Sequence, residues 1–124
     1  MRSDYREGGG FEEAAAYSRA VRIGPHVAVS GTAARNGGDT YTQTREALQR
    51  ALAAAAKLGA GVGDVLRTRL LLATGCDWEG AVRAHREAFE GVNPANTTYY
   101  VAGFIPDGVL VEVELDAVVP APPR

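Results

Sequence analysis

Three carboxylates alternate along the segment 109–118, near the end of the chain. Glu112, Glu114 and Asp116 are each separated from the next by one apolar residue. Since successive side chains of a strand point to opposite faces of a sheet, this pattern predicts a strand with all three carboxylates on one face. Neighbouring carboxylates repel each other unless water or a cation screens them. A solvated outer face and a functional role are both open for Glu114 and Asp116; Glu112 is our candidate for a general base or a water-positioning group.

The stronger sequence motifs of catalysis are absent. Gly8-Gly9-Gly10 is not followed by the Lys-Ser/Thr pair of a phosphate loop. The two histidines are expected in different elements and the single Cys76 has no partner, so we expect no metal site. Cys76 also has no neighbouring cation that would make it a thiolate nucleophile. What remains is a carboxylate, together with hydroxyls and amides that would hold a small polar ligand.

Composition indicates a single domain, spanning residues 1–124. A chain of 124 residues with 46% hydrophobic and 23% charged residues is long enough to bury roughly two-thirds of its unfolded surface. The net charge is −2 and no Lys/Arg block occurs, so nucleic acid is not expected as a partner. A lone cysteine, a polar start and no apolar run of ~20 residues predict a cytoplasmic protein without a membrane partner.

The pattern of apolar residues predicts the elements that must position these groups. We expect strands at 17–23, 26–31, 65–74, 99–104 and 109–118, and helices that end at Leu58 and Gly91. A Pro-Asp-Gly turn at 106–108 predicts that the last two strands pair as a hairpin. This order favours an α+β fold in which two helices pack on one face of a single, mainly antiparallel sheet. Self-association would cover the other face.

Several local features complete this prediction. Glycines at 8–10 predict a flexible N-terminal arm over residues 1–16, and prolines predict an extended tail at 120–124. Thr40 and Gln43 have the spacing of a capping box, and Asp77 is a candidate N-cap of the second helix.

Charge and helical spacing predict further contacts. On the strand 65–74, Arg67 and Arg69 are expected on one face, with Leu66, Thr68, Leu70 and Leu72 on the other. The arginines would pair with the acidic stripe, which at a surface contributes only about 0–1 kcal/mol. In the second helix an apolar face is predicted from Trp78, Ala81, Val82, His85 and Phe89, with His85 interpreted as a hydrogen-bonded core residue rather than a ligand.

Five segments occur in the order and spacing of the Rid (YjgF, reactive-intermediate deaminase) family. They are 29–31, 63–72, 78–89, 93–95 and 111–114, and the resemblance runs from about Tyr17 to Val119. It implies a chorismate-mutase-like fold and a homotrimer with its strands packed inward. It also implies small-molecule sites in the clefts between subunits, and hydrolysis of 2-imino or 2-enamino acids to 2-keto acids and ammonia without a metal or cofactor.

The resemblance also assigns site residues. The water-activating glutamate of the family corresponds to Glu112, and its pocket tyrosine resembles Tyr17. Its serine and backbone-amide positions resemble Ser30 and Gly31. A small hydrophilic residue of the family falls at Thr98.

One position departs from the family pattern. The deaminating members carry an arginine that clamps the substrate carboxylate, and the matching residue here is Asn96. An amide supplies no charge and does not replace a bidentate guanidinium. Arg83 matches an asparagine of those relatives. We hypothesise that Arg83 supplies the positive charge that is missing at position 96; the alternative is that Arg83 is a solvated arginine on the helix surface.

Three functions follow from these observations. The first is an imine, enamine or carbonyl hydrolase that uses Glu112. The second is a small-molecule binding or scavenging trimer without turnover; a pathway-specific biosynthetic enzyme with a substrate other than an imino acid is an alternative form of the first. The third is the ribonuclease activity sometimes attached to the family by name, which the absence of a basic stripe disfavours.

Overall fold

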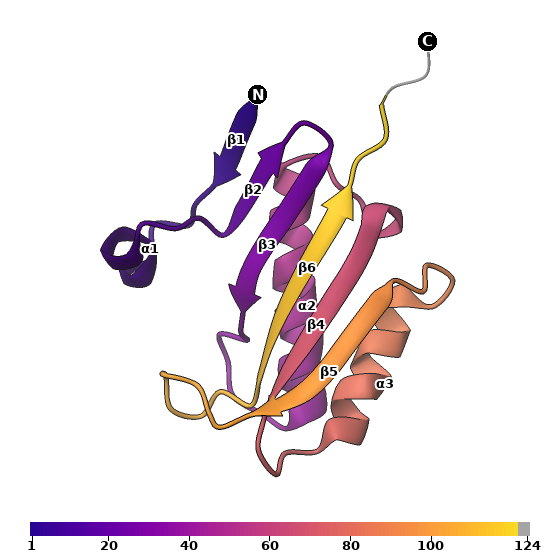
Figure 1. The fold of residues 1–124 in the computed structure, drawn as a ribbon. Coiled ribbons are helices and arrows are strands. Elements are labelled where there is room, and N and C mark those ends of the chain that lie inside the picture. Colours follow the sequence, from indigo (N-terminus) through magenta and orange to yellow (C-terminus); the bar gives the residue numbers. More distant parts are fainter. Residues whose placement is uncertain (122–124) are drawn as a thin grey trace.

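A computed structural model describes residues 1–121 of the chain. Six strands form one sheet in the order β1-β2-β3-β6-β4-β5 (Figure 1). The strands are β1 (Arg2–Tyr5), β2 (Ala20–Ile23), β3 (His26–Thr32), β4 (Val65–Ala73), β5 (Ala95–Val101) and β6 (Val111–Val118). All neighbouring pairs are antiparallel except β4 and β5, which run parallel. The prediction of a mainly antiparallel sheet is confirmed.

Two long helices, α2 (Thr40–Lys57) and α3 (Trp78–Phe89), lie together behind the sheet (Figure 1). A short helix, α1 (Gly10–Ala15), projects at the side of the sheet, and a single 3₁₀ turn, η1 (Val62–Asp64), precedes β4. No element among residues 1–121 covers the other face of β3, β6 and β4. The predicted α+β class, with both helices on one face, is therefore confirmed. Within the described residues, no helix has the length and apolar character that a membrane span requires.

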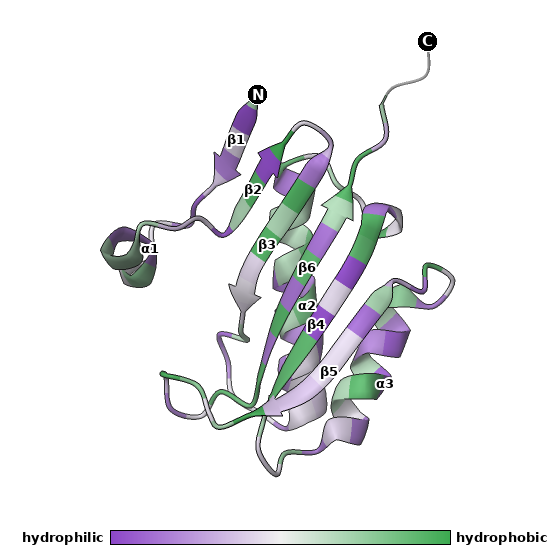
Figure 2. Cartoon of the chain, viewed as in Figure 1, coloured by the Kyte–Doolittle hydropathy of each residue, from purple (hydrophilic) through white to green (hydrophobic). Residues whose placement is uncertain are grey.

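The core lies between the sheet and the two long helices. The four apolar residues of β6, Val111, Val113, Leu115 and Ala117, are almost completely buried, as their alternation predicts. Figure 2 views the sheet from the side that the two long helices do not cover. Hydrophobic and hydrophilic residues alternate along β4 and β6 in this view. The small side chains of α2, such as Ala47 and Ala51, let this helix lie close against the strands.

Truncating the centre of this core should destabilise the fold. Leu115→Ala removes a side chain with no exposed surface, and we expect a loss of about 2–5 kcal/mol in the free energy of unfolding. Ile105 is 88% exposed, and Ile105→Ala should change stability by less than about 0.5 kcal/mol. Urea unfolding of both variants measures the difference, and equal losses would contradict the assigned core.

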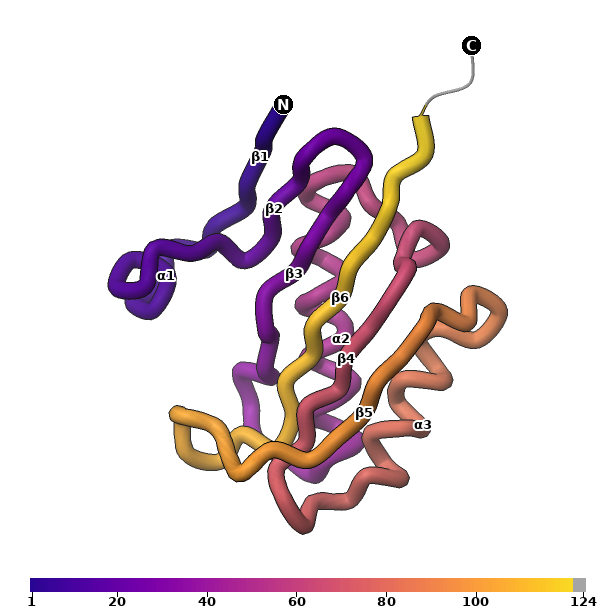
Figure 3. The backbone as a smooth tube through the Cα atoms, in the orientation of Figure 1, coloured from indigo at the N-terminus to yellow at the C-terminus, as the bar shows by residue number. Residues whose placement is uncertain are grey.

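The predicted hairpin of the last two strands is wrong. β4 lies between β5 and β6, and β5 pairs in parallel with β4 over seven residues, from Arg67↔Ala95 to Ala73↔Val101. In Figure 3 the chain leaves β5, passes the start of β6 and returns through residues 102–110. Because α3 connects β4 to β5, this crossover allows parallel pairing, and the Pro-Asp-Gly turn belongs to a wide loop.

A register shift in β4 changes the predicted faces. The shift falls between Val65 and Arg67, so that Leu66 is 60% exposed rather than buried with Thr68 and Leu70. Such an irregularity places an extra residue on one strand and turns its side chain outward. The predicted pairing with the acidic stripe is confirmed for Arg69, which lies 3.6 Å from Glu114 and 3.3 Å from Asp116.

The N-terminal arm has regular structure where a flexible segment was predicted. β1 pairs with β2, and α1 follows a loop whose backbone N–H groups bind the Glu12 carboxylate. The predicted capping box is also wrong, because Asp39 caps α2 by accepting from the Thr42 N–H at 2.8 Å. Asp77 precedes α3 as predicted but makes no side-chain cap bond. Residues 122–124 of the predicted tail lie outside the described residues.

The apolar face of α3 differs in part from the prediction. Ala81, Ala84 and Phe89 are buried, whereas Trp78 and Val82 are 51% and 44% exposed. His85 is a hydrogen-bonded, half-buried residue as predicted, with its Nε2 2.7 Å from the Thr68 hydroxyl. Burial lowers the pKa of His85, which favours the neutral ring.

Candidate functional site

Glu112 lies near the start of β6, on the face of the sheet that the helices do not cover. It pairs with Leu71 of β4, and its neighbours in sequence, Val111 and Val113, point into the core. The side chain is half-buried, which distinguishes it from a fully solvated carboxylate.

An irregularity in β3 brings the backbone close to Glu112. The pairing of β3 with β6 shifts between Val29 and Thr32, and Gly31 lies within this shift. A Cβ built on Gly31 would lie 2.6 Å from Oε1 of Glu112. A side chain at position 31 would therefore require the Glu112 carboxylate to move, because the carboxylate occupies that space.

A pocket of about 220 Å³ opens beside this contact. It is lined by Glu7, Gly9, Gly10, Phe11, Glu12, Tyr17, Arg19, Gly31, Ala33, Arg50 and Glu112. Three of the predicted site residues, Tyr17, Gly31 and Glu112, thus meet in one small concave space.

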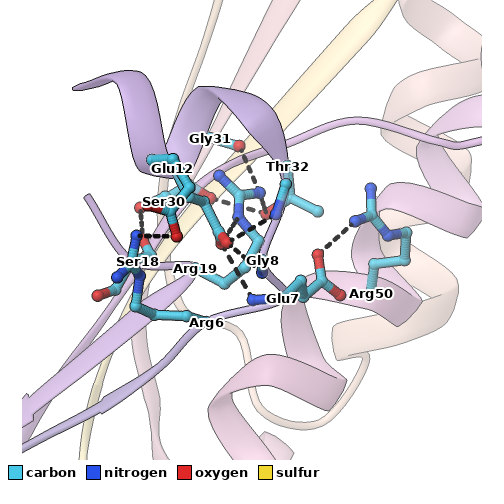
Figure 4. A network of polar contacts seen from close by, with 12 residues as sticks. Arg6, Glu7, Gly8, Glu12, Ser18, Arg19, Ser30, Gly31, Thr32 and Arg50 are labelled. Carbon is cyan, nitrogen blue, oxygen red and sulfur yellow. Dashed lines mark hydrogen bonds and ion pairs between the residues drawn. The ribbon is translucent and has the colours of Figure 1, made fainter. Parts of the chain in front are cut away.

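Arg19 lines the same pocket as Glu112, and its positive charge acts on the Glu112 carboxylate. Its Nη1 donates to the Gly31 carbonyl at 3.0 Å, and its Nε lies 3.4 Å from Oε1 of Glu12 (Figure 4). The guanidinium carbon also lies 5.3 Å from the centroid of the Tyr17 ring. Arg19 therefore ties together the tyrosine, the glycine and the arm.

Burial raises the pKa of Glu112 above its ordinary value of 4.5. The positive charge of Arg19 opposes this rise, and the negative charge of Glu114 adds to it. A carboxylate whose proton affinity is raised is a better proton acceptor once it is ionised. The local environment thus supports a general-base role.

Ser30 does not line the pocket but forms hydrogen bonds to the segment that carries Tyr17 and Arg19. Its hydroxyl donates to the Ser18 carbonyl at 2.6 Å, and its N–H donates to the Arg19 carbonyl at 2.9 Å. These bonds join β3 to the segment that carries Tyr17. Ser30 is therefore adjacent to the pocket, although it does not line it.

Asn96 and Thr98 lie on the opposite face of the sheet from Glu112. Asn96 pairs with Thr68, and its Nδ2 donates to the Thr68 hydroxyl at 3.0 Å; the Thr98 hydroxyl donates to Oδ1 of Asn96 at 2.8 Å. Thr68 in turn pairs with the buried Leu115. One chain alone therefore does not bring these two residues to the Glu112 pocket.

Comparison with known proteins decides the family. The family model described as Endoribonuclease L-PSP matches residues 10–119. The chain is 42% identical over 118 residues to uncharacterized protein SCO2049 of Streptomyces coelicolor, covering 90% of this chain and 88% of that protein. The chain belongs to the YjgF/L-PSP family.

Solved structures of this family have the same fold. Rv2704 of Mycobacterium tuberculosis, a YjgF/YER057c/UK114 family member, superimposes with a TM-score of 0.91 at 41% identity, covering 96% of this chain and 100% of that one. TdcF of E. coli, solved with bound serine, gives a TM-score of 0.77 at 22% identity over 93% and 92% of the two chains. The second likeness concerns the fold alone.

In this YjgF-family chain Arg83 does not reach the pocket. Its guanidinium carbon lies 4.1 Å from the centroid of the Tyr41 ring, so the side chain stacks on α2. Arg83 is exposed and is not among the residues that line the Glu112 pocket. Within one chain its contact is with Tyr41 rather than with the Glu112 pocket.

Four further residues of the site were missed in the sequence. They are Glu7, Glu12, Arg19 and Arg50, which form a network around the pocket (Figure 4). One signal was available: Arg19 follows Tyr17 by two residues, the spacing that places side chains on the same side of an extended chain. The contact of Arg50 with Glu7 joins positions 43 residues apart and has no local signal.

Metal ligands do not gather at this or another site among residues 1–121. No group of three or more His, Cys, Asp or Glu side chains there is arranged to hold an ion. The carboxylates, the phenol and the guanidinium groups that line the Glu112 pocket can accept or donate protons and hydrogen bonds.

Proposed function

We propose that this chain is a Rid-type hydrolase that acts on a small imine, enamine or related carbonyl metabolite. The observation that carries the proposal is the half-buried Glu112 at Gly31, in one pocket with Tyr17 and Arg19. Membership of the YjgF/L-PSP family supports a small-molecule activity of this type. A cytoplasmic location is part of the proposal.

The reaction requires one water and one proton acceptor. Glu112 accepts a proton from water as the water oxygen bonds to the imine carbon, and the proton passes to the nitrogen. The resulting carbinolamine then loses ammonia, which leaves a carbonyl compound. Tyr17, with its hydroxyl, would orient the ligand, and no metal or cofactor is needed for this balance.

A second chain would complete the site. YjgF family members are typically homotrimers, and the face of the sheet that carries Glu112 is uncovered within one protomer. Asn96 and Thr98 lie on the edge strand β5 and on the other face, so a neighbouring protomer is the means by which they would join Glu112. We therefore propose ligand sites between the subunits of a homotrimer.

Release of ammonia tests this function. Two kinds of imine are generated in situ: 2-imino acids by an amino-acid oxidase, and imines without a carboxylate by a flavin-dependent amine oxidase. At least one kind should lose ammonia faster with the protein present than without it. Saturable ligand binding with no increase in rate would favour the second candidate, a binding trimer without turnover. The uncharged Asn96 at the position of the carboxylate-clamping arginine is the observation that favours this candidate.

The pH dependence of activity should report the environment of Glu112. A general base works when ionised, so a raised pKa places the acid limb of kcat/KM above pH 4.5. Arg19→Gln removes the charge that lowers the pKa and should move the limb to higher pH. Glu114→Gln removes a charge that raises the pKa and should move it to lower pH. Shifts in the same direction for both variants would contradict the assignment.

A further inference from the structure

The N-terminal arm forms one wall of the pocket that contains Glu112. Glu7, Gly9, Gly10, Phe11 and Glu12 all line it, opposite residues that come from the sheet and α2. Two of these arm residues carry carboxylates. The arm therefore contributes charge to the pocket as well as shape.

Glu12 is a fixed anion beside Arg19. Its side chain is 3% exposed and accepts from the N–H groups of Gly8 at 2.6 Å and of Glu7 and Gly9 at 3.2 Å each. Burial alone would raise the pKa of Glu12, but these bonds and the charge of Arg19 outweigh it and hold the pKa below the ordinary value. Glu12 thus remains ionised and occupies the Nε side of Arg19 (Figure 4).

Glu7 forms an ion pair with Arg50, the second arginine that lines the pocket. Its Oε1 lies 2.9 Å from Nη2 of Arg50, and its Oε2 lies 3.2 Å from Nη2 of Arg35. The other terminal nitrogen of Arg50 donates to the Ala33 carbonyl. Each terminal nitrogen of Arg50 thus already donates to an acceptor of the chain, one to Glu7 and one to the Ala33 carbonyl.

The charges of the lining residues therefore disfavour an anionic ligand. Arg19 and Arg50 each face a carboxylate of the arm, and Glu112 adds a further negative charge. At position 96 the chain carries an amide. A ligand carboxylate would compete with Glu7 or Glu12 for its arginine and would share the pocket with the Glu112 carboxylate.

We propose that Glu7 and Glu12 are specificity-determining residues, which act as internal counter-ions of Arg50 and Arg19. They make the pocket select small imines, enamines or carbonyl compounds without a carboxylate over 2-imino and 2-keto acids. This inference rests on the proposed function, because it concerns ligands of the Glu112 pocket.

A matched pair of probes tests the selectivity. Calorimetric titration with 2-ketobutyramide and with 2-ketobutyrate compares two ligands that differ only in the carboxylate. The wild type should bind the amide more tightly. Glu7→Gln frees Arg50 and should improve binding of 2-ketobutyrate by about tenfold, the effect of one charge-assisted hydrogen bond. Glu7 is partly exposed, so this variant should fold, and Glu7→Ala serves as a second variant.

The control is Glu13→Gln on the same arm. Glu13 pairs with Arg6 outside the pocket, so this variant should leave the preference unchanged. Tighter binding of 2-ketobutyrate than of the amide by the wild type, or binding of neither probe, overturns the inference. So does an unchanged preference in both Glu7 variants. Ammonia release separates the two proposals: preference for the amide without turnover refutes the hydrolase alone, whereas turnover with preference for the carboxylate refutes the selectivity alone.

Discussion

Glu112→Gln should reduce the rate of imine hydrolysis by about 10²–10⁴-fold, the contribution typical of a positioned general base. Glutamine keeps the size of the side chain and its place beside Gly31, but it does not accept the proton of the attacking water at neutral pH. Because the carboxylate is half-buried with a raised pKa, the substitution should leave the fold intact. The measurement is kcat/KM from ammonia release, with thermal unfolding as a check of stability.

Glu114→Gln is the matched control for this substitution. Glu114 lies two residues further along β6, on the same face, and its carboxylate pairs with Arg69 at 3.6 Å. This control should retain activity apart from the shift of its pH profile. If Glu112→Gln hydrolysed imines as fast as the wild type, Glu112 would not be the base and the proposed mechanism would fail.

The parts of the fold that were predicted from the sequence depend on local periodicity. Alternation in β6 identified Val111, Val113, Leu115 and Ala117 as buried, because a strand has a fixed period of two. In α2 the buried residues Ala47, Ala51 and Ala55 recur at the spacing of one helical face, which is also a local pattern. Such patterns need no knowledge of which strand lies next to which.

The errors arose where pairing between distant segments decides the outcome. The turn at 106–108 predicted a hairpin, but pairing of β5 with β4 over seven residues placed β4 between the last two strands. The shift in β4 likewise turned Leu66 outward, which no property of Leu66 itself indicates. Strand order and register are non-local and therefore were not accessible from spacing alone.

The candidate site shows the same division. Glu112 was a candidate from the alternation of its strand, and Tyr17 and Gly31 were found through the family resemblance; the structure places all three in one pocket. Arg19 and Glu12 were not found, because their contact requires the arm to fold back against the sheet. The glycines at 8–10 were interpreted as a source of flexibility. In the structure the N–H groups of Gly8 and Gly9 donate to the Glu12 carboxylate.

Gly31→Ala should reduce the rate of imine hydrolysis while leaving the stability of the fold nearly unchanged. The added Cβ would lie 2.6 Å from Oε1 of Glu112, a distance that requires one of the two groups to move. Since the nearest atom is the end of a flexible side chain, the carboxylate can rotate away at little cost to the fold. The base then leaves its position against the substrate, and a displacement of about 1 Å can reduce the rate by about 10²-fold.

Gly37→Ala provides the control for this second prediction. Gly37 lies in the loop after β3, and a Cβ there would meet nothing within 4 Å, so activity and stability should both stay near the wild-type values. For Gly31→Ala we expect a thermal midpoint close to that of the wild type, together with the loss in kcat/KM. Full activity in Gly31→Ala would show that the carboxylate does not need its observed position. A loss of activity matched by unfolding would instead assign Gly31 a structural role, because only a folded and inactive variant shows that the position of Glu112 limits catalysis.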